Sequence, residues 1–251
     1  MRIFRKIRKK LLVSGKIKNY LIYALGEIIL IVLGVLIAWK INTLNELRKN
    51  KIVEIKIYQS LNEELNANLD LLDYAIASYT QNVQNLESTI DLILEETPKL
   101  LSEDEKKAII DVAYKPTQLH SGAINSVNTT NKFEFIESVF LKDLIAAYPN
   151  ELDNFQNQET KIENIIVNRL QPTIEKYISL IDILTQREFP CQEHKEFTLA
   201  SNYNNLLLSR SYQNCLVDRV LQTEIQLENA KTLRDKTQMI AYKLTKELEN
   251  E

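Results

Sequence analysis

Residues 20–39 read YLIYALGEIILIVLGVLIAW, a run of twenty residues in which Glu27 is the only charge. At about 1.5 Å of rise per residue, this run forms a helix of about 30 Å, which is the thickness of the hydrocarbon core of a bilayer. Tyr20 and Trp39 lie at its two ends, where aromatic rings favour the headgroup layer. The sequence therefore predicts a transmembrane helix over residues 20–41, retained as a signal anchor.

Two alternatives to an uncleaved anchor remain open for this run: a cleaved signal peptide and a buried helix of a soluble domain. A signal peptide is disfavoured because the apolar stretch is longer than the usual apolar region of such a peptide. In addition, Leu36, Ala38 and Trp39 do not form the small-x-small pattern that precedes a cleavage site. A single-pass anchor is the favoured interpretation.

Charge is distributed unevenly about this helix. Residues 1–19 contain eight Lys or Arg and no acid, whereas the seventeen residues after Trp39 contain five Lys or Arg. The positive-inside rule then places residues 1–19, a basic amphipathic segment, in the cytoplasm on anionic lipids of the inner leaflet. It places residues 42–251 outside the cytoplasmic membrane. The net charge of −3 is the sum of +7 over residues 1–39 and −10 over the rest. This small net charge does not suggest a nucleic-acid partner.

The membrane helix carries one ionisable residue, and such residues are functional candidates by default. At about 100° per residue, Glu27, Gly34 and Ala38 fall on one face, and Gly34-x-x-x-Ala38 is a small-xxx-small pairing surface. One interpretation has Glu27 bonding a partner helix or taking part in ion translocation. The alternative, which we favour, has it reaching the cytoplasmic interface or lying protonated in a homo-oligomer contact.

The rest of the chain is predicted to be all-helical, because its 251 residues contain only 4 Gly and 5 Pro. From Tyr58 the apolar residues follow a heptad repeat, which is typical of a coiled coil or an antiparallel bundle. One series comprises Tyr58, Leu65, Leu72, Tyr79, Leu86 and Ile93, and the other comprises Leu69, Ile76, Val83 and Ile90. We expect a long helix from about Leu44 to Glu96, in which about residues 42–60 form a stalk next to the membrane.

Prolines and capping residues divide the next part of the chain. Ser102 and Glu105 form a capping box that opens a short helix, which must end before Pro116. A loop around one short helix is expected to follow. The apolar segment over residues 133–145 is then expected to close one end of the bundle and to end at Pro149.

Two further long helices complete the predicted bundle. The second is expected over residues 151–186 with a kink at Pro172, and a polar connection over residues 189–202 leads to the third. Their expected inward-facing residues are Phe155, Ile162, Ile166, Leu170, Ile174, Ile178 and Ile181 on the second helix and Leu216, Val220, Leu227, Ala230, Ile240, Leu244 and Leu248 on the third. The predicted fold class is all-α: one N-terminal transmembrane helix continuing towards an elongated bundle of three long and several short helices.

Few residues are candidates for chemistry. Cys191 and Cys215 lie in the part predicted to be outside the cytoplasm, where a disulfide between them can persist; two buried thiols are the alternative. Cys191-x-x-His194 has the spacing of a metal site, but even with His120 the chain holds few ligands for zinc. No catalytic, phosphate-binding or dinucleotide-binding motif occurs. We therefore expect no metal site, no cofactor and no enzymatic activity.

The N-terminal segment as a whole resembles a known family. The matching stretches are FRKIR at residues 4–8, KNYLIYALGEI at 18–28, GVLIA at 34–38 and IN at 41–42. They are similar to the opening of a family of uncharacterised bacterial single-span membrane proteins, a domain of unknown function. Members have a basic N-terminus, a Gly-Glu pair in the membrane helix and a helical domain after it. The resemblance covers about the first forty-five residues, implies the anchor topology and carries no biochemical activity.

Together these features favour a membrane-anchored, non-enzymatic interaction or scaffold protein of the bacterial envelope, acting as a homo-oligomer or with a membrane protein partner. A sensory or ligand-binding module outside the cytoplasm is one alternative. A single-span subunit of an ion-driven envelope complex that uses Glu27 is another.

Overall fold

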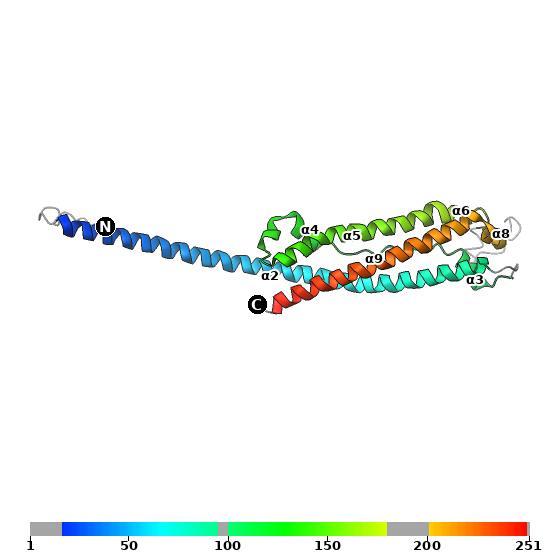
Figure 1. Ribbon diagram of the computed structural model, residues 1–251, viewed down its shortest axis with the longest axis horizontal. Helices are drawn as coiled ribbons and strands as arrows, with labels where there is room; N and C mark the ends of the chain where they lie inside the picture. Colours follow the sequence, from blue (N-terminus) through cyan, green and yellow to red (C-terminus); the bar gives the residue numbers. More distant parts are fainter. Residues whose placement is uncertain (1–16, 95–99, 180–200, 250–251) are drawn as a thin grey trace, which may run out of the picture. The chain divides into compact units, whose positions relative to one another are not determined.

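A computed structural model of the protein describes residues 17–94, 100–179 and 201–249. These residues are predominantly helical, and they contain no β-strand. The chain divides into an N-terminal unit, residues 1–55, and a C-terminal unit, residues 56–251. Helix α2, Ile17–Leu94, contributes to both units (Figure 1). The predicted all-α class and the long apolar N-terminal helix are therefore confirmed.

The N-terminal unit consists, in its described part, of the first half of α2. Its large apolar side chains lie on the surface; Leu30, for example, is 74% exposed and Trp39 is 66% exposed. Among the described residues, α2 is the one helix that is long and apolar enough to cross a membrane. The predicted span, residues 20–41, lies wholly within α2.

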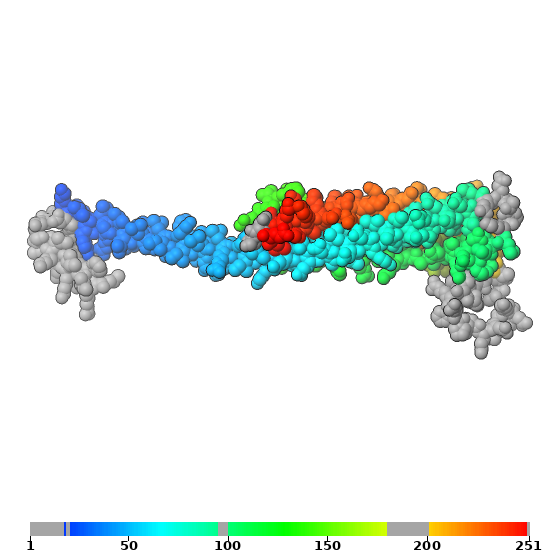
Figure 2. Space-filling model, turned by 90° about the horizontal axis from the view of Figure 1, so that it is seen from below, coloured from blue at the N-terminus to red at the C-terminus, as the bar shows by residue number. Residues whose placement is uncertain are grey.

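The C-terminal unit contains two further long helical stretches besides α2. Helix α5, Val139–Ile165, continues through a π-helical turn, η2 (Ile166–Leu170), into α6, Gln171–Ile174. Helix α9 spans Arg210–Glu249 and packs along α5. On the face shown in Figure 2, α9 and α2 lie side by side. The core of this unit lies between the three stretches.

The described residues also form four short elements: α3, Glu103–Ile109; α4, Gly122–Thr129; the 3₁₀ helix η1, Asn131–Phe135; and α8, Tyr203–Leu208. The capping box predicted at α3 is confirmed. The Ser102 hydroxyl accepts from the Glu105 N–H at 3.3 Å, and the Glu105 carboxylate accepts from the Ser102 N–H at 2.7 Å. Helix α3 ends before Pro116, and α4 is the short helix predicted in the loop that follows.

Pro149 does not mark a boundary, contrary to the sequence prediction, because it lies inside α5. A proline lacks the N–H that would donate to the carbonyl four residues earlier. Here the Asn128 side chain donates to the Ile145 carbonyl at 3.1 Å and replaces that missing donor. Ile145, Tyr148 and Leu152 stay buried along one face of α5. The apolar segment 133–145 thus ends in the first turns of a long helix instead of closing the bundle by itself.

A π-helical turn lies next to Pro172, where the sequence predicts a kink. The π turn η2 ends at Leu170, and Pro172 lies in the first turn of α6, which follows it. Because proline clashes with the carbonyl one turn earlier, a wider turn relieves the contact. Residues 180–186 of the predicted second helix lie outside the described residues.

Helix α2 buries a heptad seam that differs in part from the predicted one. The first predicted series is confirmed from Tyr58 to Leu86, whose members are at most 6% exposed, whereas its last member, Ile93, is only partly buried against the core. The second series is not the most buried line: Leu69, Ile76, Val83 and Ile90 are only half-buried, although Ile90 packs against the core. The second line of the seam lies one residue earlier, at Leu61, Asn68, Ala75 and Thr89. Two of these four residues are polar, so a search for regularly spaced apolar residues does not find them.

Helix α9 has a continuous buried seam in alternating steps of four and three residues: Tyr212, Leu216, Arg219, Thr223, Gln226, Ala230, Leu233, Thr237, Ile240 and Leu244. Of the residues predicted to face inward here, Leu216, Ala230, Ile240 and Leu244 are buried and Val220, Leu227 and Leu248 are half-buried. On the second stretch, Phe155, Ile162, Ile166, Leu170, Ile174 and Ile178 are buried, and Ile181 lies outside the described residues.

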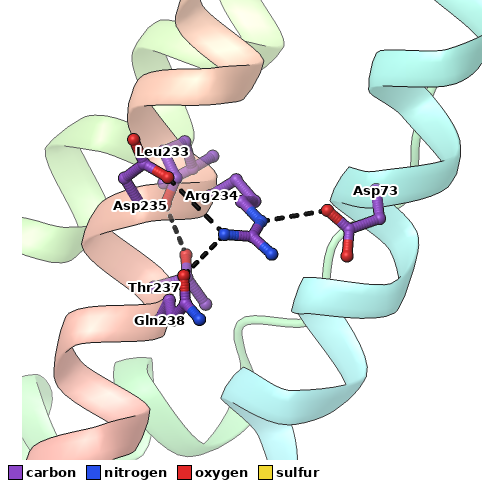
Figure 3. Close-up of polar contacts among 6 residues, drawn as sticks. All are labelled: Asp73, Leu233, Arg234, Asp235, Thr237 and Gln238. Atoms are coloured by element: carbon purple, nitrogen blue, oxygen red, sulfur yellow. Dashed lines mark hydrogen bonds and ion pairs between the residues drawn. The ribbon is translucent and has the colours of Figure 1, made fainter.

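A surface ion pair also joins α9 to α2. Arg234 donates through Nε to the Asp73 carboxylate at 3.0 Å and through Nη1 to Gln238 of its own helix at 2.5 Å (Figure 3). The Asp73 side chain is 56% exposed, and exposed pairs contribute little to stability. The two helices are therefore held mainly by their buried seams.

Candidate functional site

An extended segment crosses the C-terminal unit between α3 and α4. Residues 110–121, which we call the strap, contain no helix or strand and run lengthwise along the unit (Figure 1). No side chain of residues 111–121 is buried. Side-chain packing holds only the start of the strap, where Ile110 is buried in the core and Val112 packs against it. Elsewhere its backbone N–H and C=O groups need partners where helices cover them.

Arg219 of α9 supplies donors to the first part of the strap. Its side chain is buried in the α9 seam, with 2% exposure, and the guanidinium donates to the carbonyls of Asp111 at 2.7 Å and Ala113 at 3.1 Å. Burial lowers the pKa of Arg219, and the neighbouring Asp111 acts in the opposite direction. A guanidinium stays charged in proteins, so these are charge-assisted hydrogen bonds that account for an arginine in the core.

Helix α2 holds the other end of the strap. The fully buried Asn68 forms an amide-to-amide pair with the backbone of His120, donating to its carbonyl at 2.8 Å and accepting from its N–H at 2.7 Å. One turn earlier, the Glu64 carboxylate accepts from the N–H groups of Ala123 at 2.6 Å and Ile124 at 3.0 Å. The N-cap residue of α4 makes no side-chain cap hydrogen bond, so Glu64 caps α4 from a neighbouring helix.

Glu159 of α5 lies under the middle of the strap. Its side chain is 5% exposed, and Oε1 accepts from the Thr117 N–H at 2.7 Å and from the Tyr79 hydroxyl at 2.6 Å. The Tyr79 hydroxyl also lies 3.1 Å from the Thr117 hydroxyl. One carboxylate oxygen therefore joins α5, α2 and the strap. Glu159, Tyr79, Arg219 and Asn68, together with the two residues described next, are here called the polar layer.

Two residues of the polar layer have polar atoms without partners. Gln226 of α9 is fully buried, and within the described part of the chain neither its amide nitrogen nor its amide oxygen makes a hydrogen bond. The buried hydroxyl of Tyr114, on the strap, is likewise without a partner there. The Gln226 amide approaches the Tyr79 hydroxyl as a hydrogen-bonding neighbour and lowers its pKa, although the two groups do not reach hydrogen-bond geometry. The charge of Glu159 contributes to raising the pKa of Tyr114. The polar atoms of Gln226 and Tyr114 therefore lie close to the Glu159–Tyr79 hydrogen bond.

Two adjacent clefts open beside the strap. One, of about 340 Å³, is lined by Ser78, Tyr79, Asn82, Ala113, Tyr114 and Lys115. The other, of about 230 Å³, extends along α2 to Arg219 and Asp111. Both clefts share Asn82. Because Tyr79 and Tyr114 line the larger cleft and also belong to the polar layer, that cleft lies directly over the layer.

Burial raises the pKa values of the two central acidic groups of the layer, Glu159 and Tyr79. Burial raises the pKa of the Glu159 carboxyl, and the hydrogen bonds from Tyr79 and Thr117 act in the opposite direction without cancelling that rise. Burial, followed by the hydrogen bond to Glu159, raises the pKa of the Tyr79 hydroxyl. Tyr79 is therefore a neutral proton donor, and the layer is suited to hydrogen bonding with uncharged groups.

We expect Glu159→Gln to change the pH dependence of stability. The folded chain binds the Glu159 proton more tightly than the unfolded chain, so stability is fully present below the unfolded pKa and is lost as pH rises through the folded pKa. A Gln oxygen can still accept from Tyr79 and Thr117, so the variant lacks this loss. In urea unfolding of the full chain in detergent at about pH 4 to 8, the variant should gain stability relative to wild type as pH rises. A pH-independent difference would contradict the prediction.

The predicted site residues lie apart from the polar layer. Glu27, Gly34 and Ala38 belong to α2 in the N-terminal unit. Cys215 is buried in α9, and burial raises the pKa of its thiol. Its predicted disulfide partner Cys191, and His194 of the suggested metal spacing, lie outside the described residues. The remaining metal candidate, His120, is exposed on the strap. Among the described residues, no three His, Cys, Asp or Glu side chains converge.

Sequence reasoning missed the polar layer altogether. The signal was present in the spacing: Arg219, Thr223 and Gln226 continue the steps of four and three that link Leu216 to Ala230. Glu159 likewise stands in the seam between Phe155 and Ile162. A charged residue at a seam position predicts a buried partner for it, although the sequence does not identify that partner.

Comparison of the chain with protein-family models, with curated proteins and with solved structures gave no match. Function must therefore be argued from the residues and their arrangement.

Proposed function

We propose that the protein is a membrane-anchored, non-enzymatic interaction or scaffold protein of the bacterial envelope. The observation that carries this proposal is the apolar first half of α2, whose large side chains lie on the surface of the chain. An exposed apolar surface of this length matches the hydrocarbon core of a bilayer. The basic residues before it favour a cytoplasmic N-terminus in the inner membrane, with the acidic helical domain outside the cytoplasm.

The face formed by Gly34 and Ala38 supports self-association of the membrane helix. A methyl group added to Gly34 would meet no other atom of the chain within 4 Å, so this face is open to a neighbouring helix. Small residues four apart let two helix backbones approach closely in lipid. Glu27 lies on the same face and would be positioned by the same contact. The proposed partner is a second copy of the chain or another membrane protein.

The proposal predicts an oligomer that one substitution disrupts. Crosslinking in intact membranes should trap an oligomer of wild type, and Gly34→Leu should lower its yield by about tenfold, because the larger side chain separates the helices. Gly26→Leu is the matched control, since Gly26 also has no neighbour within 4 Å but lies about 80° away around the helix. Release of wild type by an alkaline wash would contradict the anchor. A wild-type chain that crosslinks to nothing would contradict the interaction role.

A ligand-binding or sensory role is the second candidate. It is favoured by the polar layer, where buried polar atoms of Gln226 and Tyr114 are without partners beneath an open cleft. Natural interiors pair nearly all such atoms, so the exceptions need a reason. This role is compatible with the first, because a scaffold can respond to a ligand bound in its helical domain.

A further inference from the structure

The polar layer already recognises amide groups of the peptide backbone. Asn68 pairs with both the N–H and the C=O of His120, Arg219 donates to two strap carbonyls, and Glu159 accepts from a strap N–H. All of these contacts are made to backbone atoms and none depends on the identity of a strap side chain. The interior of this bundle is thus equipped to bind an extended, uncharged peptide group.

Gln226 has the same chemistry as Asn68, but its amide is not engaged. It lies in the α9 seam two turns beyond Arg219 and offers an NH₂ group as donor and a carbonyl oxygen as acceptor. The Tyr114 hydroxyl adds a group that can donate or accept. The Asn68–His120 pair shows how a side-chain amide in this layer is satisfied, namely by a second amide that presents its N–H and C=O together.

The larger cleft supplies space and access next to these atoms. Its volume of about 340 Å³ lies at the lower end of the range for small-molecule sites. Tyr79 and Tyr114 form part of its wall, and Asn82, Ser78 and Lys115 complete it. A small displacement of the strap at Ala113 and Tyr114 would break the hydrogen bond from Arg219 to the Ala113 carbonyl and would open the cleft towards Gln226, but it would leave the packing between the helices in place.

We propose that the polar layer and the cleft above it form a binding site for a small uncharged ligand that carries a peptide-type amide. The ligand amide pairs with Gln226 as the backbone of His120 pairs with Asn68, and the Tyr114 hydroxyl makes a third hydrogen bond. A charged ligand of either sign is disfavoured because it would lose its hydration on entering the buried layer, and Arg219 and Lys115 further disfavour a cationic ligand. The site deepens the second proposed role and rests on it; it does not depend on the membrane anchor.

The test uses N-acetyl-alanine methylamide, an uncharged molecule with two amides, and the full chain in detergent micelles. Ligand-observed NMR should show saturable binding to wild type. Gln226→Met, which keeps the size of the side chain and removes both polar atoms, should weaken binding by about tenfold or more, and Tyr114→Phe by about threefold to tenfold. N-acetyl-alanine and alanine methylamide, which carry a negative and a positive charge, should bind at least about tenfold more weakly than the neutral probe.

The matched control is Gln156→Met, because Gln156 is exposed on α5 and its replacement should leave binding unchanged. Circular dichroism establishes that each variant is folded, and Tyr114→Phe provides a mild variant if Gln226→Met unfolds the chain. The proposal is overturned if wild type does not bind the probe, if both variants bind like wild type, or if the charged probes bind equally well. Crosslinking of the same variants in membranes separates this result from the scaffold role, which none of these outcomes affects.

Discussion

Replacing Arg219 by Leu should lower the free energy of unfolding by about 2 to 4 kcal/mol, one of the two largest effects we expect in the C-terminal unit. The substitution removes both donors to the carbonyls of Asp111 and Ala113 and the charged group that is buried beside them. A buried polar group that loses its partner incurs its full desolvation cost, whereas relief from burying the arginine charge offsets only part of it. Urea unfolding of the full chain in detergent, followed by circular dichroism, measures the difference.

Arg169→Leu is the matched control for this prediction. Arg169 pairs with Asp218 of α9 at 2.6 Å, but its side chain is 47% exposed. Because water replaces the lost contact, we expect a loss of about 1 kcal/mol or less. Equal effects of the two substitutions would show that Arg219 does not hold the strap. Faster hydrogen exchange of the strap amides in the Arg219 variant would locate the loss in the strap.

The parts of the fold that the sequence predicted are those governed by local rules. The long apolar helix follows from an uninterrupted run of apolar residues, and the start of α3 follows from Ser102 and Glu105. The first heptad series of α2, from Tyr58 to Leu86, was predictable because every member is apolar or aromatic. In each case, the residues that specify the element lie within the element itself.

The strap could not be predicted, because its partners lie far from it in the sequence. Asn68, Glu159 and Arg219 are separated from the strap residues they bind by 52, 42 and 106 to 108 positions. Each appears on a sequence plot as a polar residue in a helix and so suggests a solvent-facing position. The same reason explains the error at Pro149, where the compensating donor is the side chain of Asn128 on α4.

These contacts suggest why the seams of α2, α5 and α9 become polar beside the strap. A fourth helix in this place would satisfy its own backbone hydrogen bonds and would need only apolar neighbours. An extended segment cannot satisfy its backbone groups internally, so the surrounding helices must supply donors and acceptors. Polar residues at seam positions therefore supply the hydrogen-bond donors and acceptors that an extended segment in the bundle needs. Gln226 is another polar residue at a seam position.

The corrected register of α2 gives the second large prediction. Leu65 is fully buried in the confirmed seam series, whereas Leu69 belongs to the predicted second series and is only half-buried. Leu65→Ala should therefore lower the free energy of unfolding by about 2 to 5 kcal/mol, because it removes buried methyl groups and leaves a cavity. Leu69→Ala makes the same chemical change one turn away and should lower it by about 1 kcal/mol. Both are measured by urea unfolding of the full chain in detergent. A loss at Leu69 as large as that at Leu65 would place Leu69 in the seam, and the register with Asn68 as a core residue would then be incorrect.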